Sequence, residues 1–148
     1  MKKEKIKIRK INVSIFLCFI IYIMVLLYIT LLGRLSEQTN MVSVCPLWSY
    51  VEIIKEGNQK LACQIFYNIL AFIPLGFFLP FLVRQMQYIW KVILCGFLFS
   101  TIIEFVQYLF HLGWCDIDDI INNTMGVALG YGIWYIGRKL LRNFLMCQ

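Results

Sequence analysis

Three stretches of the chain are long enough and apolar enough to cross a lipid bilayer as helices. They cover residues 11–33, 62–83 and 90–112. A spanning helix needs about 20 predominantly apolar residues, because the hydrocarbon core of a bilayer is roughly 30 Å thick. Hydrophobic residues make up 61% of the chain, and the mean hydropathy is +0.75. We therefore expect an integral membrane protein whose main partner is the lipid bilayer.

A fourth stretch, residues 117–137, is more polar than the other three. Its first half contains Asp118, Asp119, Asn122 and Asn123. Such residues are tolerated in a membrane helix when they face protein or water. We therefore predict an all-α fold, a polytopic bundle of four transmembrane helices. The single membrane domain, 1–148, divides into an N-terminal anchor helix at about 11–33, an outer loop at 34–61 and a core at about 62–137.

Basic residues are distributed unevenly between the two sides of such a bundle. With four spans, the two termini and the turn at 84–91 share one side, which holds eleven of the fourteen Lys and Arg residues. Only Arg34, Lys55 and Lys60 fall on the other side. The positive-inside rule therefore predicts that both termini are cytoplasmic. This bias also explains the net charge of +6, so the charge gives no support for nucleic-acid binding.

Polar residues follow one face of each of the last two predicted helices. The i, i+3, i+4, i+7 spacing links Glu104, Gln107, Tyr108 and His111. A similar spacing links Asp119, Asn122, Asn123, Gly126 and Gly130. In the second helix, Asn68 lies at about the same depth in the membrane as Glu104, given a rise of about 1.5 Å per residue. We expect these faces to meet in an acidic pocket that opens to the outside, with Gly126 and Gly130 allowing another backbone to come close.

The predicted pocket defines two sets of candidate site residues. The candidate ligand-binding residues are Asn68, Glu104, Gln107, Asp116, Asp118, Asp119, Asn122 and Asn123. Clustered carboxylates repel one another, and an amine, a shared proton or a divalent cation relieves that repulsion. Carboxylate oxygens suit Mg²⁺ or Ca²⁺, which makes Asp116, Asp118 and Asp119 the candidate metal ligands.

These acids also have a purely structural interpretation. The three aspartates suit the first turn of a helix, where the helix dipole and capping favour negative charge. Glu104 would then be hydrogen-bonded to Asn68 or Gln107 and hold helices together. Pairing of Cys45 with Cys115 is left open by the sequence.

Three ordered motifs resemble those of the VanZ-like family, membrane proteins named after a teicoplanin-resistance protein. They are NILAFIPLGFFLP at 68–80, GFLFSTIIEFVQ at 96–107 and DIDDIINNTMGVALGYG at 116–132. The resemblance implies a small helical bundle in the bacterial plasma membrane, associated in some members with lowered susceptibility to lipoglycopeptide antibiotics. Many members have an arginine shortly before the D-I-D-D run, whereas this chain reads LGWCDIDD. This departure from the family pattern counts against any mechanism that needs a cation next to the aspartates.

Three functions remain open at this point. The pocket would bind the head group of an envelope lipid or the cationic part of an antibiotic. Alternatively, the protein is a metal-assisted enzyme acting on lipid-linked envelope substrates, with Glu104 or His111 as the general base. As a third alternative, the polar residues pack a scaffold for a partner protein, which the sequence does not identify.

Overall fold

The computed structural model describes residues 2–32, 42–43, 45–112 and 115–146. Its elements, in chain order, are α1 (Lys2–Leu31), β1 (Val42–Ser43), α2 (Trp48–Glu56), α3 (Gln59–Leu82), the 3-10 helix η2 (Arg84–Gln87), α4 (Ile89–Leu109), β2 (Cys115–Asp116) and α5 (Ile117–Met146). The fold is helical apart from two very short strands, which confirms the predicted class. Residues 33–41 and 44 of the predicted outer loop lie outside the described residues.

Three helices are long and apolar enough to cross a membrane within the part of the chain that the structure describes. They are the Val13–Leu31 part of α1, α3 and α4. The fourth predicted span, α5, has sufficient length at 30 residues but begins with a polar half. Three of the four predicted spans therefore form helices with the length and apolar composition that a membrane span requires.

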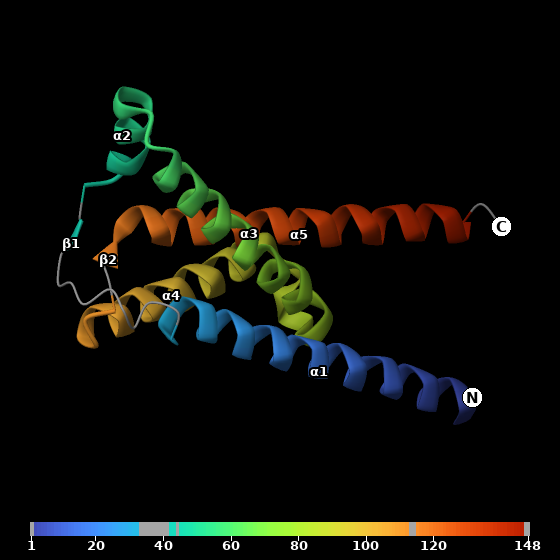
Figure 1. The fold of residues 1–148 in the computed structure, drawn as a ribbon. Helices are drawn as coiled ribbons and strands as arrows, with labels where there is room; N and C mark the ends of the chain where they lie inside the picture. Colours follow the sequence, from blue (N-terminus) through green and yellow to red (C-terminus); the bar gives the residue numbers. More distant parts are fainter. Residues whose placement is uncertain (1, 33–41, 44, 113–114, 147–148) are drawn as a thin grey trace.

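The four long helices form one bundle with distinct ends. α5 packs against α3 and α4, and α1 packs mainly against α3. The start of α1 and the end of α5 lie at one end of the bundle, whereas α2, β1 and β2 lie at the other, which we call the α2 end (Figure 1). The strands are parallel, with Val42 opposite Cys115 and Ser43 opposite Asp116. This pairing holds the acidic segment after α4 at the α2 end.

Glycines bring the backbones of α3 and α5 into contact. A Cβ atom at Gly126 would overlap the carbonyl oxygen of Ile69, and one at Gly130 would overlap that of Ile73. The expectation that this G-x-x-x-G motif lets another backbone come close is confirmed, and that backbone belongs to α3 rather than α4. α4 meets α5 differently, since the Val127 side chain fills the space beside Gly96. A side-chain layer thus separates these two backbones.

The C-terminal end of α4 differs from the sequence-based expectation. The helix ends at Leu109, and His111 adopts a left-handed backbone conformation with φ of 60°. The Leu112 N–H then donates to the Gln107 carbonyl at 2.9 Å, which closes the helix end. Tyr108 and His111 are exposed, so only the Glu104 and Gln107 half of the predicted polar stripe faces inward. The chain reverses before His111 can continue that face.

Candidate functional site

Six acidic and amide side chains of α4 and α5 are almost completely buried. This buried polar cluster consists of Glu104, Gln107, Asp118, Asp119, Asn122 and Asn123, none of them more than 3% exposed. All six belong to the predicted ligand-binding set. Their burial agrees with the rule that polar groups in membrane helices face the bundle interior. The prediction that the polar face of the 117–137 helix points inward is confirmed.

Hydrogen bonds from the cluster join three helices. Asn68 on α3 donates through Nδ2 to Asp119 Oδ1 at 2.6 Å, and Gln64 donates to the other oxygen at 3.5 Å. Between α4 and α5, the Asn123 amide donates to Ser100 Oγ at 2.9 Å. The sequence matched Asn68 in depth to Glu104, Asn122 and Asn123, whereas the structure places it in direct contact with Asp119.

Glu104 links α4 to the short strand that precedes α5. Its Oε2 atom accepts a hydrogen bond from the backbone N–H of Asp116 at 3.2 Å. Carboxylates seldom lie inside a membrane helix without such partners. Glu104 therefore fixes the position of β2 and, through it, the start of α5.

Asp118 holds the N-terminus of α2. Its two carboxylate oxygens accept from the backbone N–H groups of Leu47 at 2.6 Å and Ser49 at 2.9 Å. The first N–H groups of a helix have no partner within the helix and are normally satisfied by a local capping side chain. Leu47 has no side chain that can do this, so Asp118 supplies the cap from a distant part of the sequence. This contact attaches α2 to α5.

Asp116 lies between the cluster and the exterior. It is half-buried, and its carboxylate accepts from Ser49 Oγ at 3.3 Å and from the Asp118 N–H at 3.0 Å. Burial raises the pKa of this carboxyl above its ordinary value, and the neighbouring Asp118 carboxylate raises it further. Hydrogen bonds from Ser49 and Asp118 act in the opposite direction. Asp116 is therefore held in a negative environment close to the surface.

Three buried amide atoms of the cluster have no hydrogen-bond partner among the described residues. They are Gln107 Oε1, Asn122 Nδ2 and Asn123 Oδ1. The other amide atom of each residue is used: Gln107 donates to the Thr30 carbonyl at 2.8 Å, and Asn122 accepts from the Tyr50 hydroxyl. An unsatisfied buried polar atom costs about 1–3 kcal/mol. The cluster is thus maintained at a cost in folding stability.

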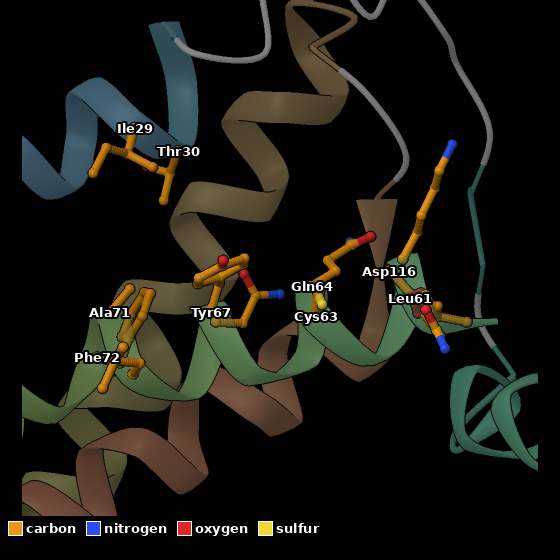
Figure 2. Close-up of a pocket in the computed structure, with 13 residues that line it drawn as sticks. Ile29, Thr30, Leu61, Cys63, Gln64, Tyr67, Ala71, Phe72 and Asp116 are labelled. Atoms are coloured by element: carbon orange, nitrogen blue, oxygen red, sulfur yellow. The ribbon is translucent and has the colours of Figure 1, made fainter. Parts of the chain in front are cut away.

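A pocket of about 1010 Å³ opens beside the buried polar cluster, between α1 and the first half of α3 (Figure 2). It is lined by Ile29, Thr30, Gln59, Lys60, Leu61, Cys63, Gln64, Tyr67, Asn68, Leu70, Ala71, Phe72 and Asp116. Only Asn68 and Asp116 come from the predicted ligand-binding set. The other six predicted residues lie in the protein interior, so the open pocket has fewer acids than the sequence suggested.

Sequence reasoning did not select Lys60, Gln64 and Tyr67, which line the pocket. Their spacing of four and then three residues places them on one face of α3, together with Ala71. Helical periodicity was therefore a usable signal. The predicted set included only Asn68 from α3, because its depth in the membrane matches that of Glu104.

The three candidate metal ligands do not form a metal site in the part of the chain that the structure describes. No group of three or more His, Cys, Asp or Glu side chains is placed to hold a metal ion there. Both oxygens of Asp118 bind backbone N–H groups, and those of Asp119 bind side-chain amides. The geometry therefore does not fit Mg²⁺ or Ca²⁺ held jointly by Asp116, Asp118 and Asp119.

The two candidate general bases lie in different environments. Glu104 is 3% exposed within the bundle, whereas His111 is exposed on the turn beyond the end of α4. A general base must reach the proton that it removes within hydrogen-bond distance. A substrate reaches Glu104 only by entering the protein interior, whereas it reaches His111 only from the surface.

The described cysteines are all free. These are Cys18, Cys45, Cys63, Cys95 and Cys115, so the open possibility of a Cys45–Cys115 bridge is not realised. Burial raises the pKa of the Cys115 thiol, and the carboxylates of Glu104, Asp116 and Asp119 raise it further. A thiol in this environment stays protonated and is a poor nucleophile.

Comparison with known proteins identifies the family of the chain. The VanZ/LLP1 family model matches residues 16–140. A protein from Enterococcus faecium named "Protein VanZ" is 31% identical over 83 residues, which are 56% of this chain and 49% of that protein. The chain thus spans about half the length of this curated relative. No solved structure matches. Because the family model covers most of its length, the chain belongs to the VanZ/LLP1 family.

Proposed function

We propose that the protein crosses the bacterial plasma membrane four times, with α5 as the fourth span and both termini in the cytoplasm. The buried polar cluster supports this, because the polar residues of α5 face α3 and α4 rather than lipid. The outward face of the same helix is apolar. Met125, Leu129, Ile133 and Ile136 are each about half exposed. Such a helix is suited to lipid despite its polar first half.

In this membrane, the proposed function is to lower susceptibility to glycopeptide or lipoglycopeptide antibiotics such as teicoplanin. The protein would act at the outer half of the membrane by binding a lipid head group or an amine-bearing ligand. Family membership and the name of the Enterococcus faecium relative support an antibiotic-related role. The observation that carries the binding mechanism is the pocket that Asn68 and Asp116 both line, because both residues also contact the buried polar cluster.

Susceptibility measurements test this proposal. Cells that express the protein are compared with cells that express Asp116→Asn or Asn68→Leu, and the minimal inhibitory concentration of teicoplanin is measured. Both variants are expected to lose most of the protection, because the pocket loses either its carboxylate or the polar side chain of Asn68. Glu56→Gln is the matched control, since Glu56 is an exposed acid of α2 outside the pocket. Full protection by both variants at normal membrane levels would contradict the proposal.

A further inference from the structure

We propose that the pocket between α1 and α3 binds an aminophospholipid, with one acyl chain along α3, the phosphate at Lys60 and the amine at Asp116. This inference rests on the proposed function and deepens it, because it names the ligand class of the same pocket. It uses pocket residues that the sequence did not single out.

The pocket has a polar end and an apolar end. Figure 2 shows Leu61 and Asp116 at one end, with Ala71 and Phe72 at the other. Lys60, Gln64 and Asp116 line the polar end, which is the α2 end of the bundle. A ligand that fills this space must itself be amphipathic, with its polar group at the α2 end.

The apolar part of the pocket faces the bilayer. Ile29, Tyr67 and Leu70 line it and expose 58%, 64% and 49% of their surfaces. They belong to α1 and α3, two helices that are apolar enough to span a membrane. A ligand therefore enters this part from the surrounding lipid. A water-soluble ligand is disfavoured on this path, because the side chains along it are apolar.

The length of the pocket matches one leaflet. Its α3 lining runs from Gln59 to Phe72, a rise of roughly 20 Å at about 1.5 Å per residue. Half of a hydrocarbon core that is roughly 30 Å thick measures about 15 Å. A single acyl chain with its head group accordingly fits between the α2 end and Phe72.

The charges at the polar end favour a zwitterionic head group. Lys60 is the only Lys or Arg among the described lining residues and lies in the first turn of α3, where the helix dipole favours an anion such as phosphate. Asp116 lines the same pocket and suits an ammonium group. Gln64 and Asn68 also line the pocket, where their amides donate to Asp119 and add no charge. A phosphate linked to an amine satisfies both charges at once.

Native mass spectrometry of the full-length protein tests this inference. The purified protein is titrated with phosphatidylethanolamine, phosphatidylglycerol and phosphatidylcholine that carry identical acyl chains. We expect a one-to-one complex with phosphatidylethanolamine that is about tenfold tighter than with the other two, because only this lipid presents amine donors to Asp116. Equal retention of the three lipids would overturn the assignment of the amine to Asp116.

Variants separate the parts of the site. Asp116→Asn is expected to remove the preference for phosphatidylethanolamine and leave phosphatidylglycerol binding unchanged, whereas Lys60→Gln weakens the binding of both. Leu70→Trp fills the acyl groove and lowers binding of every lipid. Leu129→Trp is its matched control, since Leu129 is 52% exposed on α5 and outside the pocket. Lipid binding that is the same in the Leu70 and Leu129 variants would rule out the groove.

Two further results distinguish the inference from related possibilities. Soluble phosphoethanolamine should displace the lipid only weakly, because it lacks an acyl chain. Displacement of the lipid by an equal concentration of phosphoethanolamine would show that the site recognises the head group alone.

Antibiotic susceptibility is measured separately in cells. Lipid binding by the parent protein without any protection of its cells would refute the proposed function alone, whereas loss of lipid by the Leu70→Trp variant with unchanged protection would separate the lipid from that function. Lost protection with normal lipid binding would refute the lipid assignment as its mechanism.

Discussion

Asp118 shows that one of the predicted ligand residues has a clear structural task. Both of its oxygens are used by backbone N–H groups of the α2 segment, and only 1% of its surface is exposed. The sequence suggested that acids here belong to the first turn of a helix, and Asp118 does lie in the first turn of α5. Its capping partner is α2, a different helix, and no local sequence pattern indicates such a contact across 69 to 71 residues.

Removal of the Asp118 carboxylate should therefore loosen α2. In Asp118→Ala, the Leu47 and Ser49 N–H groups lose their acceptor, and we expect a loss of about 1–3 kcal/mol in the free energy of unfolding. Hydrogen exchange of the backbone amides of α2 should accelerate, while exchange in α3 stays slow. Exchange followed by mass spectrometry in detergent micelles gives this measurement.

Glu56→Ala is the control for this substitution, because it removes an exposed acid from the last turn of the same helix. It should leave exchange at Leu47 and Ser49 unchanged. Unaltered exchange of α2 in Asp118→Ala would mean that its position does not depend on α5.

The residue types of the buried polar cluster were predictable, but their accessibility was not. Helical spacing correctly indicated that Glu104, Asp119 and Asn123 face the bundle interior. It did not indicate whether that interior is an open, water-filled pocket or closely packed protein. Helical spacing gives the direction in which a side chain points, but not its distance from the neighbouring helix. That distance is set by the backbone contact of α3 with α5 at Gly126 and Gly130.

At the level of helices, this α3–α5 contact is the tightest feature of the bundle. The sequence showed that two glycines four residues apart permit close approach. It could not show which helix approaches, since Gly76 on α3 and Gly96 on α4 are equally compatible partners by composition. In the structure, a Cβ atom at Gly76 would overlap the carbonyl oxygen of Val127, so α3 contributes its own glycine to the contact.

Substitution of these glycines should separate α3 from α5. Gly126→Ala and Gly130→Ala place a methyl group against backbone carbonyls that cannot move independently, and we expect each to lower stability by about 1–3 kcal/mol. Thermal unfolding in detergent micelles measures the change. Because Asp119 on α5 binds Asn68 on α3, the same substitutions should disturb the pocket wall.

Gly132→Ala provides an internal control on the same helix, since a Cβ atom there meets nothing within 4 Å. Alanine is also the better helix former, so this variant should be as stable as the parent protein or slightly more so. Equal destabilisation at positions 126 and 132 would show that helix contact is not the cause.

For the whole molecule, the apolar surface of the helices is what differs from a water-soluble bundle. The buried polar cluster lies inside, while apolar side chains of α1, α3, α4 and α5 cover the surface. Sequence hydropathy predicted this for α1, α3 and α4 because their apolar runs are continuous. It could not settle α5, where a polar face and an apolar face average to a moderate value; only the packing against α3 and α4 shows that the two faces are separated.

Cysteine labelling in cells decides whether α5 spans the membrane. At about 1.5 Å per residue, its 30 residues extend roughly 45 Å, which exceeds the hydrocarbon core. In a background that lacks the other cysteines, Cys45 should react with a membrane-impermeant maleimide on intact cells. A single cysteine introduced as Asn143→Cys, near the end of α5, should react only after permeabilisation. If both positions react on intact cells, the end of α5 lies on the same side of the membrane as α2, and α5 does not span the membrane.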